Sequence, residues 1–537
     1  MAGDIDELVP KGTPTDVKKQ AAQSPRAPAF DPSLNIPVGP VTGTPLKHRL
    51  VVIGDSLAHG FQSGAIFNTA ISYPAIIAYE LGWLDQFHYP RYGGPGGLPF
   101  NIEYLLRELE DRFGAETSPW ELPFALFRGR EFLDGLEDYW ERGPGRDIPE
   151  LAGYMHALAV YGWDLRDALA KSATSCRALI ATPRDNFLDQ MIENSTERAA
   201  LRVYPSWPES SWPMTLFDAA VALGQDRSAG EDHGIETLVV ELGANNALGS
   251  VVRLQLAWSG AGYDDLARKG AYTVWTPKHF AAELSDVVDQ VKRVAARHVI
   301  WCTVPHVTIP PLARGVGSKL RPGSRYFPYY TRPWIDDARF DANRDEHLTG
   351  AEARAIDAAV DLYNEAIQNV VEQARSGADG TVRNWYLLDL AGILDRLAAR
   401  RYISDPNARP AWWTPYPLPP LLAAMQPVPD SRFLTSDGEG GRATGGLFSL
   451  DGVHPTTVGY GLIAQELINI MHAAGVTFYR ANVVRPSPVL VDFESLIRRD
   501  TLIHHPPRNI DSTLSILGWA DETLGMIKRA LRFKPQL

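Results

Sequence analysis

Short apolar runs alternate along the chain with longer segments of helical periodicity. Five runs are predicted to be strands, at residues 50–53, 86–92, 237–241, 298–304 and 385–390. The first of these, Leu50-Val51-Val52-Ile53, is apolar throughout, which is typical of a strand that is buried on both faces of a parallel sheet. The first run ends at Gly54, directly before a polar Asp-Ser pair.

Helical patterns separate the later strands. Apolar residues recur every three to four positions over 277–294, after Thr276-Pro277, and over 356–370, before Gly377. The Thr-Pro pair predicts a capped helix start, and the glycine predicts a helix end. Helices are also expected near 100–109 and 462–471. Strands that alternate with helices predict crossover connections, and hence an α/β fold with helices on both faces of a parallel sheet.

The regions around this core suggest how the chain is organised. Residues 1–46 are polar and proline-rich, so we expect a disordered N-terminal arm. Residues 47–486 would form the main domain, with large insertions near 101–235 and 305–445, and 487–537 a C-terminal helical tail. Both insertions are rich in aromatic residues. Most of these would simply pack, but the insertions could also form a lid or an acyl-binding wall.

Composition excludes some functional classes. The net charge of −12, from Lys+Arg 52 against Asp+Glu 64, argues against a nucleic-acid partner. The two cysteines, Cys176 and Cys302, cannot form a disulfide framework and match no zinc motif, and Cys302 is expected to be a buried thiol. No secretory signal or bilayer-spanning run is visible, so the sequence predicts a cytoplasmic protein.

Two distant motifs supply the parts of a covalent acyl-transfer site. Ser56 follows the first predicted strand, at the edge of the sheet where active sites of α/β proteins lie. Asp451 and His454 stand three residues apart, directly before a predicted helix. A serine hydroxyl needs a base to accept its proton, and an orienting carboxylate holds that base. The three side chains therefore predict a nucleophile, a general base and its partner.

Two further segments are candidates for stabilising an oxyanion. The turn at 93–97 contains Gly94 and Gly96, whose N–H groups could approach a ligand closely, although taken alone the segment is more often a plain Gly-Pro turn. Asn245 follows the third predicted strand and could donate from its carboxamide, although an Asn pair after glycine is more often a turn.

In this order, the motifs Gly54-Asp55-Ser56-Leu57, Gly243-Ala244-Asn245-Asn246 and Asp451-Gly452-Val453-His454-Pro455 resemble the GDSL, or SGNH, hydrolase superfamily. The resemblance implies a flavodoxin-like three-layer α/β/α fold and hydrolysis of carboxylic esters without a cofactor or metal. It implies that Ser56, His454 and Asp451 are catalytic. It also implies oxyanion donors at the Ser56 N–H, at Asn245 and at a turn glycine, with Gly96 favoured over Gly94. Asn246 stands where the family usually has Asp.

Three other features have competing interpretations. Residues 341–352 imitate a calcium-binding EF-hand loop, but Glu346 replaces the required glycine, and a capping box from Thr349 to Glu352 competes. His306 follows the fourth predicted strand and could contact substrate or replace His454 as base, although a structural role is the default. The basic segment 512–534 could dock on the domain, which we favour, or lie on a membrane surface.

We therefore expect a serine esterase or lipase that acts on a small-molecule or lipid ester through an acyl-enzyme. Acyl transfer from the same site is one alternative. A non-catalytic binding protein on a hydrolase fold is the other, because folds are reused without their chemistry.

Overall fold

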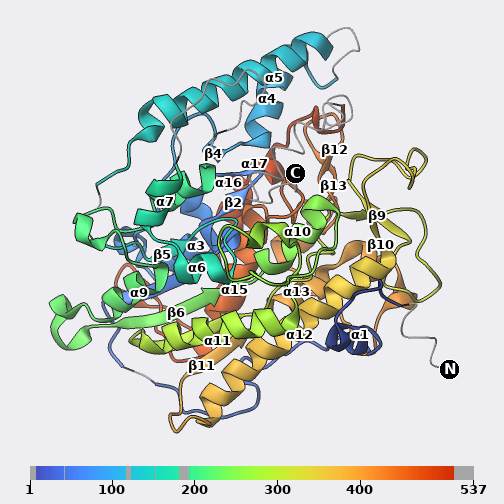
Figure 1. The fold of residues 1–537 in the computed structure, drawn as a ribbon. Coiled ribbons are helices and arrows are strands. Elements are labelled where there is room, and N and C mark those ends of the chain that lie inside the picture. The colour runs from blue at the N-terminus through green and yellow to red at the C-terminus, as the bar shows by residue number, and fades with distance from the viewer. Residues whose placement is uncertain are drawn as a thin grey trace.

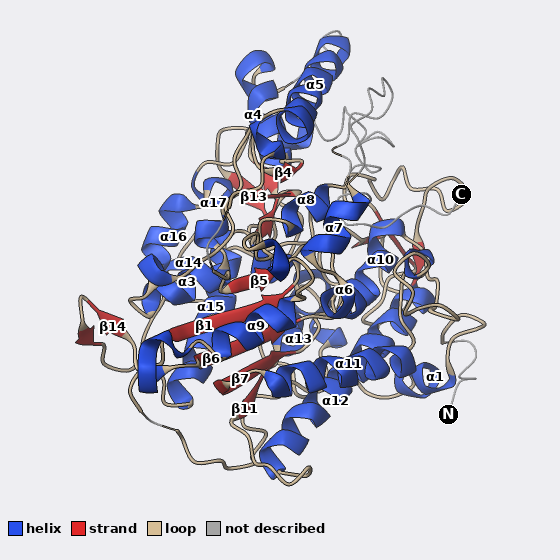
Figure 2. Ribbon diagram, turned by 60° about the vertical axis from the view of Figure 1, so that its left-hand side comes forward, coloured by secondary structure: helices blue, strands red, loops and turns tan. Residues whose placement is uncertain are grey.

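The centre of the fold is a five-stranded parallel sheet. The computed structural model describes residues 8–41, 43–116, 122–150, 153–180, 192 and 194–512. The sheet strands are β1 (His48–Gly54), β5 (Ala157–Ala159), β6 (Ile235–Glu241), β7 (Ala296–Cys302) and β11 (Trp385–Leu388), in the spatial order β5-β1-β6-β7-β11. Ile53 of β1 lies opposite Leu158 on one side and Val240 on the other. Figure 2 shows these strands in the middle of the molecule.

Helices cover both faces of this sheet, which gives three layers. Leu50 and Val52 pack on one face with α3 (Tyr73–Glu80) and α15 (Thr457–Ala473). Val51 and Ile53 pack on the other, with α9 (Leu216–Gly224), α11 (Pro277–Arg293) and α12 (Gly350–Ser376). Successive side chains of a strand point to opposite faces, so an apolar strand serves two cores. The α/β expectation and the parallel sheet are confirmed.

Four of the five predicted strands are confirmed as β1, β6, β7 and β11, with small shifts in their bounds. The strand expected at 86–92 is wrong. A 3₁₀ turn, Leu84–Gln86, leads into irregular chain there, and the His88 carbonyl accepts hydrogen bonds from the His156 and Ala157 N–H groups at the start of β5. The second strand of the central sheet along the chain is β5, inside the region predicted to be an insertion. A strand of three residues, such as β5, is too short to show a hydrophobic pattern in the sequence.

The expected helices are confirmed as α4 (Ile102–Phe113), α11, α12 and α15, each longer than or shifted from its pattern. Thr276 caps α11, and Gly377 ends α12 with φ 70°. At the start of α12, Glu352 accepts from the Thr349 N–H at 2.7 Å while its own N–H donates to the Thr349 hydroxyl at 3.2 Å. The capping-box interpretation of this segment is therefore confirmed. The Glu352 carboxylate, which an EF-hand would need as its last calcium ligand, is engaged in this cap.

The N-terminal arm differs from the expectation of disorder over its described part, 8–41 and 43–46. It contains α1 (Thr15–Ala21), with Val17 and Ala21 buried, and α1 lies beside α12 (Figure 1). Farther along, the Pro32 carbonyl accepts from the Leu387 N–H on the outer side of β11 at 2.9 Å. Backbone pairing and a few small apolar contacts order this polar segment, and neither leaves a periodic pattern in the sequence.

The remaining elements lie mostly in the long connections. Residues 101–235 hold α4, α5 (Leu122–Glu137), α6 (Leu165–Ala170), α7 (Ala173–Leu179), α8 (Ser195–Ala200) and α9 besides β5; residues 305–445 hold β8 (Arg314–Gly315), β9 (Tyr329–Thr331), β10 (Leu348–Thr349), α12, β11, α13 (Leu390–Leu397), α14 (Pro420–Ala423), β12 (Thr435–Ser436) and β13 (Arg442–Thr444). Elsewhere lie α2 (Ser56–His59), β2 (Phe61–Gln62), β3 (Ala65–Ile66), β4 (Leu98–Pro99), α10 (Asn245–Arg253), β14 (Tyr479–Arg480), β15 (Val483–Val484), α16 (Phe493–Arg499) and α17 (Thr501–His504). Figure 1 shows α4 and α5 projecting from the body. The basic tail from 513 onward lies outside the described residues.

Candidate active site

The nucleophile candidate stands at the carboxyl end of the central strand β1. The Asp55 side chain accepts from the Leu57 N–H at 3.3 Å and caps α2, of which Ser56 is the first residue. The turn needs a glycine at position 54, because a Cβ there would lie 2.5 Å from the Ala58 Cβ and 3.0 Å from the Glu241 carbonyl oxygen. The close packing around Gly54 thus fixes the path of the backbone in this turn, and with it the position of Ser56.

Ser56, His454 and Asp451 form a continuous hydrogen-bonded chain. The Ser56 Oγ lies 2.8 Å from His454 Nε2, and His454 Nδ1 lies 3.1 Å from Asp451 Oδ2. All three side chains are nearly inaccessible to solvent. Burial raises the pKa of Asp451, but His454 and nearby backbone N–H groups outweigh it, so that this pKa lies below its ordinary value. The carboxylate is therefore ionised at neutral pH and can hold the ring with Nε2 toward the serine.

The loop that carries His454 is anchored on both sides. Asp451 Oδ1 accepts from the Val453 and His454 N–H groups, each at 2.8 Å, and Asp451 Oδ2 also accepts from the Gly64 N–H at 2.9 Å. The His454 carbonyl accepts from the Ser449 N–H at 2.8 Å. These bonds tie the catalytic loop to the chain that follows α2, so the two distant motifs are held as one unit.

Asn245 lies beside the nucleophile, as the sequence predicts. Its Nδ2 donates to Asp55 Oδ2 at 3.2 Å and to the Trp163 carbonyl at 2.9 Å, while its Oδ1 is buried with no hydrogen-bond partner among the described residues. Both amide hydrogens are thus engaged in this state, and donation to an oxyanion requires one of these two bonds to be exchanged.

Gly94 and Gly96 make local contacts. A Cβ on Gly94 would meet the Tyr139 ring, and the Gly96 carbonyl accepts from Asn101 Nδ2, where Asn101 caps α4. Their predicted role depended on a sheet strand directly before them, and residues 86–92 form none. These contacts agree with the interpretation of residues 93–97 as a plain turn. The role of Gly94 or Gly96 as an oxyanion donor stays a prediction.

The glycine that follows the second sheet strand is Gly162, which the sequence reasoning missed. It has φ 74° and stands between Tyr161, whose N–H donates to His59 Nδ1, and Trp163, whose carbonyl accepts from Asn245. The Val160 N–H donates to the Gly54 carbonyl. Gly162 is therefore held at the same sheet edge as Ser56. The apolar run 157–160 that precedes it is too short to predict a strand from the sequence alone.

Two carboxyl groups lie beneath the nucleophile. Burial raises the pKa of Asp55 to about 6, although the Leu57 N–H and His454 oppose this rise. Burial and the neighbouring Asp55 raise the pKa of Glu241 well above its ordinary value. With a pKa of about 6, Asp55 is still mostly ionised at neutral pH, whereas burial favours the protonated form of Glu241. The two groups therefore carry less negative charge together than two carboxylates would. A lower negative charge there favours an oxyanion that develops on a bound carbonyl.

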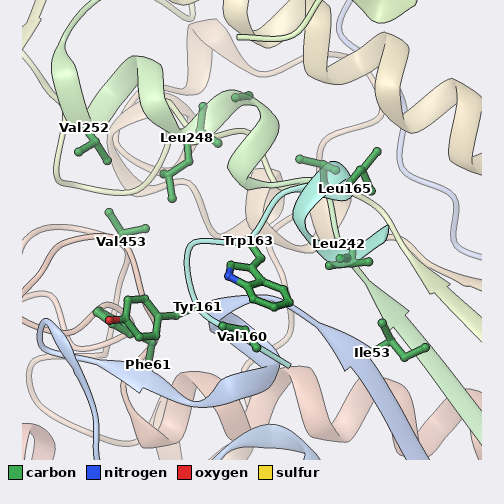
Figure 3. Close-up of a cluster of buried hydrophobic side chains, with 14 of the residues drawn as sticks. Ile53, Phe61, Val160, Tyr161, Trp163, Leu165, Leu242, Leu248, Val252 and Val453 are labelled. Atoms are coloured by element: carbon green, nitrogen blue, oxygen red, sulfur yellow. The ribbon is translucent and has the colours of Figure 1, made fainter. Parts of the chain in front are cut away.

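Apolar side chains surround the catalytic loop. The Phe61 ring lies with its centroid 4.5 Å from that of His454 and 5.0 Å from that of Tyr161. Figure 3 shows Phe61, Tyr161 and Val453 on one side of Trp163, and Leu165 and Leu242 on the other. The immediate surroundings of His454 are therefore apolar and aromatic.

His306 is not placed to act as the base. Its Nε2 lies 3.1 Å from Asp361 and its Nδ1 3.2 Å from Asp395, so both ring nitrogens already have carboxylate partners. Burial lowers the pKa of His306, but these carboxylates outweigh it and raise the value to about 10. A histidine ring that is already protonated at neutral pH cannot accept a proton from a serine. His306 therefore has the structural role that was the default expectation.

Both cysteines are buried free thiols, as expected for Cys302. Within the described ranges, no helix combines the length and the apolar character that crossing a bilayer requires. Comparisons of the chain with models of protein families, with curated proteins and with solved structures find no match.

Proposed function

We propose that the protein is a serine hydrolase of the GDSL/SGNH type that cleaves carboxylic esters through an acyl-enzyme. The hydrogen-bonded chain from Ser56 through His454 to Asp451 carries the proposal. Its members come from segments almost 400 residues apart, and a serine–histidine–carboxylate chain is the arrangement that activates a hydroxyl for acyl transfer.

The chemistry follows from these positions. The Ser56 Oγ attacks the ester carbonyl carbon while His454 Nε2 takes the hydroxyl proton, and Asp451 stabilises the charged ring. The tetrahedral intermediate collapses, its C–O bond to the alcohol breaks, and His454 gives the proton to the leaving oxygen. Water then repeats the sequence on the acyl-enzyme and releases the acid. The Ser56 N–H, Asn245 and Gly162 are the proposed donors to the oxyanion.

The order of the strands also supports a flavodoxin-like fold. Counted along the chain, the sheet runs 2-1-3-4-5, which is the flavodoxin-like order, and the ligand site of such sheets lies where that order reverses, at the first strand. Ser56 follows that strand. The aromatic walls favour an ester whose acyl or alcohol part is apolar.

Hydrolysis of short p-nitrophenyl esters tests the proposal. Ser56→Ala should abolish hydrolysis and labelling by a fluorophosphonate, while Ser376→Ala, a matched change on the exposed end of α12, should leave both unchanged. Turnover by the Ser56→Ala variant that equals the unmodified protein would contradict the assignment. Acyl transfer to an added alcohol, without release of free acid, would favour the acyltransferase alternative. No labelling and no turnover on a panel from acetate to palmitate would favour a binding protein.

A further inference from the structure

A cavity of about 450 Å³ lies behind the catalytic loop, outside the Ser56 site. Residues from the long connections at 305–445 form most of its wall, including Pro311, Ala313 and Phe433. Between the first two, the Leu312 N–H donates to the Gly452 carbonyl at 2.9 Å, and Phe433 lies 3.3 Å from where a Cβ on Gly452 would stand. The cavity therefore adjoins the turn that joins Asp451 to His454.

The lining of this cavity combines many cationic side chains with an aromatic surface. Five arginines line it, against two aspartates, Asp336 and Asp511; the arginines are Arg314, Arg325, Arg400, Arg401 and Arg432. Phe327, Tyr330 and Trp334 supply the aromatic surface. A volume of several hundred Å³ is typical of a small-molecule site and far exceeds what a single inorganic ion fills.

Three of these arginines have carboxylate partners inside the protein. Arg401 lies 2.9 Å from Asp357 and donates to the Thr308 hydroxyl at 2.7 Å. Arg432 pairs with Asp430 at 3.1 Å, and Arg314 pairs with Asp337. These side chains are held in place by their partners, so they shape the wall.

Arg400 and Arg325 differ from the other three. In the part of the chain that the structure describes, neither has a carboxylate within ion-pair distance. The Arg400 guanidinium lies 5.0 Å from the Phe327 ring centroid, and Arg325 lies 5.1 Å from that of Tyr326. Burial, together with the nearby Arg314 and Arg432, lowers the pKa of Arg400. Burial also lowers the pKa of Arg325, but nearby tyrosines together with Asp357 and Asp361 outweigh it and raise the value well above its usual range. A half-buried guanidinium without an ion pair, as at Arg400, is unfavourable, and a bound anion would relieve this.

We propose that this cavity binds a small organic anion, with a phosphate or carboxylate head against Arg400 and Arg325 and an apolar or aromatic body against Phe327, Tyr330 and Trp334. Planar guanidinium groups match the oxygen geometry of both head groups. The site does not include Ser56, so this proposal does not depend on the proposed ester hydrolysis.

Isothermal titration calorimetry on the full chain tests the proposal, with phenyl phosphate and benzoate as probes. At least one of them should bind saturably and more weakly at high salt. Arg400→Gln should weaken that binding about tenfold or more, because a charge-assisted pair is lost, whereas Arg400→Lys should retain part of it. The matched control Arg498→Gln, at an exposed pair with Glu494 on α16, should leave it unchanged.

Several results would overturn the proposal. No heat from either probe at millimolar concentration would do so, as would equal binding by Arg400→Gln and the unmodified protein. Benzyl alcohol that binds as tightly as the anions would refute the charged head. Inorganic phosphate that binds as tightly as phenyl phosphate would refute the organic body. Ser56→Ala should bind the probes normally, so failure here and failure of the proposed hydrolase are separable.

Discussion

Asp451→Asn tests the chain from Ser56 through His454 to Asp451 directly, because both oxygens of the Asp451 carboxylate accept hydrogen bonds and an amide NH₂ group cannot accept them. Oδ2 accepts from His454 Nδ1 and the Gly64 N–H, and Oδ1 accepts from the Val453 and His454 N–H groups. Whichever way the asparagine turns, its NH₂ group faces two donors. If it faces Nδ1, the ring must shift its proton to Nε2, and it can then no longer accept the proton of Ser56.

The expected loss can be estimated from that change of tautomer. In a serine triad, the change from aspartate to asparagine leaves the histidine protonated on the wrong nitrogen and lowers kcat roughly 10³–10⁴-fold. This loss corresponds to about 4 to 5.5 kcal/mol of transition-state stabilisation. Initial rates with p-nitrophenyl acetate measure kcat, and the rate of fluorophosphonate labelling reports Ser56 reactivity without turnover. Both should fall together.

The control for Asp451→Asn is Asp437→Asn, the same change in an exposed turn of the same region, where the side chain accepts from the Glu439 and Gly441 N–H groups. It should retain full activity. Thermal melting of both variants shows whether the fold survives. A folded Asp451→Asn enzyme with kcat within tenfold of the unmodified protein would refute the role of this carboxylate.

Three further outcomes are expected. Asn245→Ala should lower kcat for p-nitrophenyl acetate roughly 10²–10³-fold, and unchanged kcat would remove Asn245 from the oxyanion site. Burial raises the pKa of Asp500 from 3.8 to about 7, so between these pH values the native state binds a proton that the unfolded state has lost. The free energy of unfolding, relative to that of Asp500→Asn, should therefore fall by about 1.4 kcal/mol per pH unit across that window. Urea titrations in which the difference between the two proteins stays constant with pH would contradict this. Thr349→Ala removes one half of the α12 capping box and should lower the free energy of unfolding by about 1 kcal/mol, whereas an unchanged urea midpoint would show that the cap contributes nothing.

Long apolar strands and helices with caps were predictable because their signals are local. The runs around Ile53 and Val240 and the periodic helix 356–370 appear where the sequence places them. The meeting of Ser56 with His454 was also predictable, since Ser56 follows a strand that ends at the active-site edge of a parallel sheet and the motif around His454 supplies the base and carboxylate that such a serine needs.

The second sheet strand and the glycine beside it were not predictable from pattern. β5 has three residues and is set by its neighbours β1 and His88, so its tertiary contacts, not its own sequence, define it. The aromatic segment 86–92 was predicted to be the second sheet strand, and this error also led to the prediction of Gly94 and Gly96 as oxyanion donors. Gly162 becomes visible only once β5 is placed.

The contact between Pro32 and Leu387 has a consequence for how the protein behaves in solution. β11 is the outermost strand on its side, and an uncovered outer strand offers its free N–H and C=O groups to any other chain. The arm covers part of that edge from within the same molecule. Proteolytic removal of the first forty residues should therefore leave a protein that still folds but associates with itself, a liability that truncated variants made for crystallisation or expression would inherit.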